Sequence, residues 1–188
     1  MTIGIWHGDK ETMNQEANHR LGRDFFIRDA TEVAPALVGK TLVRVFPDGR
    51  TIRRLITEVE IYRGEEDEAC HASKGMTTRN RVMYSEGGLI YVYLIYGMYW
   101  MLNFVTGPEG HPQAVLIRGI DGFDGPGKLT RALEVDGSFY GEDLTRSERI
   151  WVEEGIKNFR IGKGKRIGID YAGEKWRSKP WRYFLKKS

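Results

Sequence analysis

Cysteine is almost absent from this sequence of 188 residues, which contains only Cys70. A single cysteine excludes an intrachain disulfide framework and is typical of proteins that work in a reducing compartment. The four histidines, His7, His19, His71 and His111, lie far apart, and no pair has the spacing of metal ligands. We therefore predict no structural zinc site, no other metal and no cofactor.

We also predict no secretory signal, because the first twenty residues do not combine a basic segment with an apolar one. Its uncharged run GGLIYVYLIYGMYWMLNFVTGP, residues 87–108, approaches the ~20 residues of a membrane helix. Four tyrosines, an asparagine and a central glycine suit such a helix poorly, and β-forming residues dominate both halves. We predict a buried β-hairpin here and no association with a membrane.

The rest of the composition is that of an ordinary folded protein. Hydrophobic residues make up 40% of the chain and charged residues 29%, so one compact domain with a genuine core is expected. The polar residues 1–20 lack sustained periodicity. We predict a loosely ordered extension over residues 1–20 and a single domain over residues 21–188.

Positive charge is concentrated near the C-terminus. Residues 157–188 contain eleven Lys and Arg against Asp170 and Glu174, a local net charge of +9. The whole chain carries +3, so the remaining residues carry −6. Aromatic residues alternate with the basic ones. The segment therefore fits either a surface that binds nucleic acid or an ordinary solvated basic surface.

Local patterns predict the order of helices and strands. A short helix is expected in DATEVAPALVGK, where Asp29 or Thr31 caps the start and Gly39 marks the end. Residues 41–62 form a hairpin around the turn PDG, and the aromatic hairpin is followed by a strand over 114–120. A helix begins at Pro126, and the basic tail adds strands and loops. We predict an α+β fold with antiparallel pairing.

The stretch EVEIYRGEEDEACH, residues 58–71, holds six carboxylates. Strand alternation places Glu58, Glu60 and Tyr62 on one face, with the two carboxylates about 7 Å apart, and Val59 on the opposite face toward the core. The four acids at 65–68 are interpreted as a solvated turn or a helix cap. Arg118 is flanked by apolar residues in the strand 114–120, so it needs an anionic partner.

Either Glu60 or Glu58 can be the partner of Arg118 if the two strands are neighbours. A simple structural ion pair and a functional pair both fit this pattern.

The motifs TEVEIYRGEEDEACH, RNRVMY, YVYLIYGMYWMLN, AVLIRGI, GPGKLTRAL and RIGIDYAGE…KPWRYF occur in this order. Together they resemble the 3-methyladenine (alkyladenine) DNA glycosylase family, the single-domain type without a helix-hairpin-helix. The resemblance runs from about Leu21 to the C-terminus. It implies a curved antiparallel β-sheet with flanking helices and a protruding β-hairpin.

The resemblance also implies roles for individual residues. Glu60 matches the glutamate that activates the attacking water, and Arg118 matches the arginine that helps to hold this water. Tyr62, His71 and Tyr93 match the side chains that enclose the flipped base. Asn103 matches the residue that opposes the 2-amino group of guanine, and Cys70 and Leu116 adjoin these positions and are expected to contact the base.

Other residues are expected to contact the DNA itself. Tyr96 matches the side chain that enters the gap left by the base, with Gly97 and Met98 beside it at the tip of the hairpin. The basic residues expected on the DNA backbone are Lys128, which an exposed position in a helix would explain equally well, Arg79 and Arg166.

The implied activity is hydrolysis of the N-glycosidic bond of alkylated or deaminated purines in double-stranded DNA. Because no lysine stands in the catalytic motifs, we expect a monofunctional glycosylase without lyase activity. We further expect a monomer, located in the cytoplasm at the nucleoid in a prokaryote, or in the nucleus in a eukaryote. A nucleic-acid-binding module without chemistry is one alternative, and a glycosidase acting on nucleosides or sugars is another.

Overall fold

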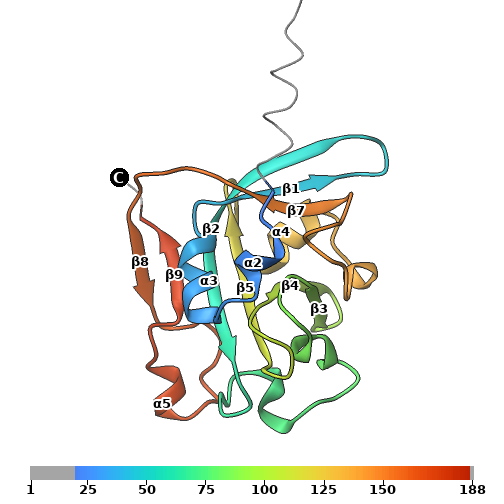
Figure 1. The fold of residues 1–188 in the computed structure, drawn as a ribbon. Helices are drawn as coiled ribbons and strands as arrows, with labels where there is room; N and C mark the ends of the chain where they lie inside the picture. Colours follow the sequence, from blue (N-terminus) through green and yellow to red (C-terminus); the bar gives the residue numbers. More distant parts are fainter. Residues whose placement is uncertain (1–19, 187–188) are drawn as a thin grey trace, which may run out of the picture.

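A computed structural model gives the fold and describes residues 20–186 (Figure 1). The extension expected over residues 1–20 lies outside the described residues, apart from Arg20. This residue forms an antiparallel bridge with Glu153, and its guanidinium lies 4.4 Å from the centre of the Trp151 ring.

Within residues 20–186, nine strands form one sheet in which every pairing is antiparallel. The main order is β3-β4-β5-β2-β1-β7, with β6 paired to β5, β9 to β2 and β8 to β9. The strands are β1 (Thr41–Val45), β2 (Thr51–Arg63), β3 (Ile90–Ile95), β4 (Tyr99–Val105), β5 (Gln113–Ile120), β6 (Phe123–Asp124), β7 (Ile150–Glu153), β8 (Ile161–Gly164) and β9 (Arg182–Leu185).

Helices are few and short, and they lie around the sheet. They are α2 (Arg23–Phe26), α3 (Ala30–Leu37), α4 (Pro126–Ala132) and α5 (Glu174–Arg177), with 3-10 turns η2 (His71–Lys74), η3 (Arg81–Tyr84) and η4 (Gly137–Phe139). Over residues 20–186, no helix is long and apolar enough to cross a bilayer. The expected α+β fold on a curved antiparallel sheet is confirmed.

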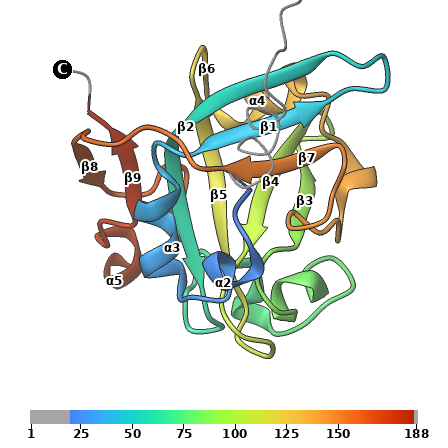
Figure 2. The same cartoon turned by 45° about the horizontal axis from the view of Figure 1, so that its top comes forward.

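Strand β2 is the centre of the sheet because it changes neighbours along its 13 residues. Residues 51–55 pair with β1, whereas residues 56–63 pair with β5. On the edge of β2 that faces away from β5, β9 takes over from β1 and pairs with residues 58–60. Figure 2 shows β1 between β2 and β7, and β9 farther along β2. Glu58 and Glu60 therefore lie between two strands.

The main core lies between α3 and the sheet. Helix α3 begins after Asp29, whose carboxylate accepts a hydrogen bond from the backbone N–H of Thr31, as expected for its N-cap. The helix contacts β2 and β5. Val33 and Leu37 from α3 and Val59 from β2 are fully buried in one cluster. The predicted core face of β2 is confirmed at Val59.

The aromatic run forms the predicted hairpin, with β3 and β4 in register from Ile90 opposite Phe104 to Ile95 opposite Tyr99. Its turn places Tyr96 at φ 51° and Gly97 at φ 67°. Two successive positive φ values are typical of a type I′ turn, a tight turn whose twist suits a hairpin. The side chain of Tyr96 is 86% exposed, so the hairpin carries an aromatic ring into solvent.

Pairing between β2 and β5 is interrupted by a bulge. Glu58 lies opposite Gly119 and Val59 lies opposite Ile117, so the register leaves Arg118 without a partner on β2. Such bulges bend a strand and redirect side chains, and they are frequent next to active sites. Here the bulge directs Arg118 toward the carboxylates of β2.

Candidate active site

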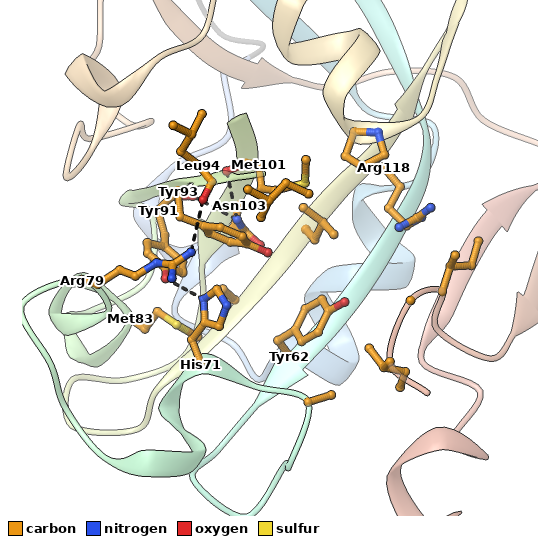
Figure 3. Close-up of a pocket in the computed structure, with 18 of the residues that line it drawn as sticks. Tyr62, His71, Arg79, Met83, Tyr91, Tyr93, Leu94, Met101, Asn103 and Arg118 are labelled. Atoms are coloured by element: carbon orange, nitrogen blue, oxygen red, sulfur yellow. Dashed lines mark hydrogen bonds between the residues drawn. The ribbon is translucent and has the colours of Figure 1, made fainter. Parts of the chain in front are cut away.

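A cavity of about 560 Å³ opens between the aromatic hairpin, β2, β5 and the loop that follows β8. Figure 3 shows its lining, with the rings of His71 and Tyr93 across the cavity from Tyr62. Eight of the residues singled out from the sequence line this cavity: Tyr62, His71, Arg79, Tyr93, Tyr96, Asn103, Leu116 and Arg118. Segments far apart in the sequence thus meet at one site.

Glu60 lies directly behind this lining. Its side chain is completely buried, yet each of its oxygens has polar contacts. Oε1 accepts a hydrogen bond of 2.8 Å from the backbone N–H of Ile167, and Oε2 accepts one of 3.0 Å from the hydroxyl of Tyr62. A carboxylate oxygen can accept two hydrogen bonds. Oε2 therefore keeps the capacity to accept one more, for example from a water molecule.

Burial decides the proton affinity of Glu60. Desolvation raises the pKa of its carboxyl above the ordinary value, while Arg118 and the hydrogen bonds from Ile167 and Tyr62 oppose that rise. The negative charge of Glu58 adds to it. A carboxylate with a raised pKa is a better proton acceptor than an exposed one, which suits a general base.

Arg118 is shared between two carboxylates. Its Nε lies 3.1 Å from Oε1 of Glu58 and 3.4 Å from Oε1 of Glu60. The contact with Glu58 has hydrogen-bond geometry. The expected proximity of Arg118 to these acids is confirmed, and it is made with both acids rather than with one. The acids of the stretch 58–71 therefore separate into the pair Glu58 and Glu60 beside Arg118 and the four acids at 65–68 away from it.

Aromatic side chains make much of the wall of the cavity, among them Tyr62, His71 and Tyr93. The ring centres of His71 and Tyr93 are 4.5 Å apart, and Nδ1 of His71 shares a hydrogen bond of 2.8 Å with the hydroxyl of Tyr91. Desolvation, reinforced by the charge of Arg79, lowers the pKa of His71 to about 4. The His71 ring is therefore neutral at pH 7. Burial also raises the pKa of Tyr62 and Tyr93, so both phenols stay neutral.

Asn103 lies on the floor of the cavity. Its Nδ2 donates to the carbonyls of Tyr91 and Met101, at 3.1 and 3.2 Å, and these two bonds fix the orientation of the amide. Leu116 lines the cavity beside it. Cys70 does not line it, and its expected contact with the base stays a prediction. It lies just before η2 and is 2% exposed in an apolar cluster, where burial raises the pKa of its thiol to about 12.

The residues expected to contact DNA differ in their surroundings. Tyr96, Gly97 and Met98 form the exposed tip of the hairpin, and Tyr96 also lines the cavity mouth. Lys128 is exposed in the first turn of α4. Arg79 is at the cavity, where its guanidinium lies 5.1 Å from the centre of the Tyr93 ring.

Arg166 is not available to DNA, and its expected contact with the backbone is wrong. Its side chain is 0% exposed and forms an ion pair with Asp67 at 2.6 Å. It also donates to the carbonyls of Ile61 and Trp176. Asp67 is equally buried, so this acid belongs to the interior rather than to the solvated turn expected over 65–68. It does accept a hydrogen bond from the backbone N–H of Ala69, as a cap would.

Several residues at the site were not expected from the sequence, among them Tyr91, Ile167, Tyr171 and Arg182. Tyr91 could have been found, because it stands two residues before Tyr93 on a strand and so shares its face. Ile167 acts through its backbone N–H, and Arg182 reaches β2 through strand pairing. Neither leaves a local signal. Within residues 20–186 no group of three His, Cys, Asp or Glu side chains is arranged to hold a metal.

Comparison with known proteins identifies the family. A family model described as methylpurine-DNA glycosylase matches residues 24–124 and 121–188. The chain belongs to the methylpurine-DNA glycosylase family. A relative from Methanocella arvoryzae is 47% identical, with 89% of this chain and 93% of the relative covered. A relative from Desulfitobacterium hafniense is 41% identical, with 90% and 96% covered.

A third relative, from Borreliella burgdorferi, is 40% identical, with 88% of this chain and 96% of the relative covered. All three are named "Putative 3-methyladenine DNA glycosylase". Membership of the methylpurine-DNA glycosylase family confirms the predicted class of enzyme, a DNA glycosylase of the 3-methyladenine type. It also decides among the three functions considered from the sequence, against the module without chemistry and the sugar glycosidase.

Proposed function

We propose that this glycosylase takes a damaged purine out of double-stranded DNA, encloses it in the cavity, and hydrolyses its N-glycosidic bond with a water molecule activated by Glu60. The observation that carries the proposal is the position of Glu60. It is a buried carboxylate with one free acceptor site, held by Arg118 and Tyr62 at the back of an aromatic cavity.

Base flipping is proposed because a glycosidic bond within the stack of a duplex is inaccessible to a buried carboxylate. The cavity supplies flat surfaces on both sides: Tyr62 on one, and His71 with Tyr93 on the other. Stacking on such rings is worth roughly 1–3 kcal/mol per base. Alkylated purines are electron-poor and should stack well. A neutral His71 adds no positive charge beside a base that is itself cationic.

Bond cleavage passes through a state with positive charge on the sugar, as in glycoside hydrolysis. Glu60 removes a proton from the water, and its negative charge also stabilises the developing cation. The carboxylate is covered in the free protein, so water reaches Oε2 when the entering base shifts Tyr62 or Arg118. Arg118 then lies beside both the water and the carboxylate.

Tyr96 is proposed to fill the space that the base leaves in the stack. It is a large exposed ring at a tight turn beside the mouth of the cavity, and inserted side chains of this kind hold bent or unstacked DNA. Lys128 and Arg79 are cations near this mouth and are proposed to contact phosphates, with a binding affinity that falls steeply as salt is added.

The remaining features of the proposal concern the substrates, the product, the oligomeric state and the location. Alkylated purines such as 3-methyladenine and deaminated purines such as hypoxanthine are the proposed substrates, and the product is an abasic site without strand cleavage. The enzyme is proposed to act as a monomer. The enzyme would work where the genome is, at the nucleoid in the cytoplasm of a prokaryote or in the nucleus of a eukaryote.

The test is base release from a duplex oligonucleotide that carries one hypoxanthine or one alkylated purine, measured as alkali-labile sites under single-turnover conditions. Loss of a general base costs typically 10²–10⁴-fold, so Glu60→Gln should lower release by at least ~10²-fold and leave damaged-duplex binding nearly unchanged. Glu153→Gln, on β7, is the matched control and should release base normally. A Glu60→Gln variant with the normal rate would remove Glu60 from the mechanism.

A further inference from the structure

The second carboxylate at Arg118 has no part in the reaction described so far. Glu58 is partly exposed, with 27% of its side chain accessible, whereas Glu60 is inaccessible. Both acids face the same Nε of Arg118, and the shorter contact, 3.1 Å against 3.4 Å, is the one to Glu58. Arg118 is therefore held by Glu58 at least as firmly as by the proposed catalytic acid.

Glu58 is in turn held by a second arginine, from β9. Nη1 of Arg182 donates to Oε1 of Glu58 at 3.2 Å, the same oxygen that accepts from Arg118. Nε of Arg182 donates to the carbonyl of Lys165 at 2.9 Å. Two residues farther on, the N–H of Ile167 donates to Glu60. One guanidinium thus connects Glu58 with the loop that supplies a hydrogen bond to Glu60.

We propose that Glu58 and Arg182 are positioning residues, which hold Arg118 and the backbone of Ile167 in place around Glu60. The inference rests on the proposed function, because it assigns Glu60 the role of general base. Glu58 draws Arg118 away from a closed ion pair with Glu60, and Arg182 fixes both Glu58 and the loop of residues 165–167.

The physical reason is competition for one guanidinium. Without the charge of Glu58, Arg118 would move onto Glu60, because a buried carboxylate and a guanidinium form a strong hydrogen-bonded pair when no other acceptor competes. The pair would occupy the acceptor site that water needs and would make Glu60 a weaker base. The competing carboxylate therefore keeps an acceptor site of Glu60 free for water and keeps Glu60 basic.

The groups that face Glu60 set the expected pH dependence. They are Glu58 and Tyr62 from β2, Arg118 from β5, Tyr93 from β3 and the N–H of Ile167. Glu58 raises the pKa of Glu60, and Arg118 lowers it. Removing the charge of Glu58 removes the first effect and strengthens the second, so both changes favour deprotonation of Glu60 at lower pH.

The experiment compares Glu58→Gln with the parent protein in single-turnover release at saturating enzyme, as a function of pH. Misplacement of about 1 Å near reacting groups can cost 10²-fold, so we expect the maximal rate to fall by roughly 10- to 100-fold. We also expect the acidic limb of the pH profile to move to lower pH, while the dissociation constant for damaged duplex changes by less than about threefold. A residue that only supports the fold would not move that limb.

Arg182→Lys and Arg182→Gln provide a second measurement in case Glu58→Gln folds poorly. The ammonium group of lysine keeps the charge but lacks the planar fork that reaches two acceptors, and the amide of glutamine lacks both the charge and this fork. Both variants should therefore lose about tenfold in rate. Glu153→Gln is the matched control. It removes a strand carboxylate that pairs with Arg53 at 3.1 Å, at the other end of the sheet, and should behave as the parent.

The outcomes separate this inference from the proposed function. Suppose that Glu60→Gln is inactive, but that Glu58→Gln and both Arg182 variants match the parent in rate and pH profile. This result overturns the inference and leaves the proposed function standing. A slower Glu58→Gln with an unmoved acidic limb also overturns it. If the parent protein itself releases no base, the proposed function and this inference are both wrong.

Discussion

Two arginine–carboxylate clusters contact Tyr62 and differ in what surrounds them. Arg166 and Asp67 are both 0% exposed, and the Arg166 guanidinium lies 5.0 Å from the centre of the Tyr62 ring and 5.1 Å from that of Trp181. Arg118 and its two acids lie at the wall of the cavity instead, and Arg118 itself is partly exposed. The first cluster is sealed by protein, and the second is open to a ligand.

The difference shows why a buried ion pair alone does not mark a functional site. Both Nη atoms of Arg166 have protein partners, and Asp67 binds Arg166 with both of its oxygens. Nε of Arg166 has no partner, but it is buried and Arg166 does not line the cavity, so a substrate does not reach it. Glu60 has a free acceptor site directly behind Tyr62 and Arg118, which line the cavity. Unused hydrogen-bonding capacity at a cavity, rather than burial or charge, distinguishes the site that can perform chemistry.

The largest effect should come from breaking the sealed pair. Asp67→Asn leaves the guanidinium of Arg166 buried without its counter-charge, and removal of one partner of a buried pair costs about 3–5 kcal/mol. Denaturant unfolding should show this loss. Below the unfolding transition, the release rate per folded molecule should be close to that of the parent. A large fall in this rate would remove the distinction between the two clusters.

Glu174→Gln is the control for that experiment, because it breaks the exposed pair between Glu174 and Arg177. It should change the free energy of unfolding little, since surface pairs are screened by water and salt.

The next effect is a gain of stability in the open cluster. The pKa of Glu60 is raised in the folded protein. The stability linked to its proton is therefore fully present below the unfolded pKa, about 4.5, and is lost as pH rises through the folded pKa. At pH 7 the charged Glu60 therefore lowers the free energy of unfolding. Glu60→Gln should raise the free energy of unfolding by roughly 0.5–2 kcal/mol, the usual range for stabilising substitutions.

The gain in stability of Glu60→Gln over the parent should shrink as the pH is lowered toward 4.5. Thermal unfolding of the variant and the parent between pH 7 and pH 4.5 measures this gain. A Glu60→Gln variant less stable than the parent at pH 7 would place Glu60 with the structural acids, beside Asp67.

The smallest effect concerns Tyr62, which touches both clusters. Tyr62→Phe keeps the ring beside Arg166 but removes the hydroxyl that donates to Glu60. One such hydrogen bond is worth about 0.5–1.5 kcal/mol, so base release should slow by roughly three- to tenfold. Because this bond lowers the pKa of Glu60, its loss should move the acidic limb of the pH profile to higher pH.

Glu58→Gln is expected to move the same limb in the opposite direction, so the two variants check each other. Movement of both in one direction would contradict the arrangement of charges around Glu60.

Most of the fold could be predicted from local sequence signals. The turn PDG, the cap at Asp29 and the proline at position 126 each fix a nearby backbone geometry, and the elements that they predict are present in the structure. Strand alternation also placed Glu58 and Glu60 together correctly. These features depend on residues within a few positions of one another, which is the range over which sequence patterns are informative.

Contacts between residues far apart in the sequence could not be predicted from those signals. Arg166 follows the same basic pattern as its exposed neighbours, and only the packing of the loop after β8 buries it against Asp67, 99 positions away. Arg182 and Glu58 are separated by 124 positions. The bulge at Arg118 arises from pairing between two strands, so no single segment predicts it. The roles of the site residues came from the resemblance to a family and stay predictions.

The apex of the aromatic hairpin shows what an exposed ring demands of its backbone. Tyr96 adopts a positive φ that glycine or asparagine accepts with far less strain, at a cost of about 1–3 kcal/mol for a residue of its kind. A search for heat-resistant variants that screened only for folding would therefore tend to replace Tyr96 early. It would yield sturdier molecules that had lost the exposed ring proposed to enter the DNA stack.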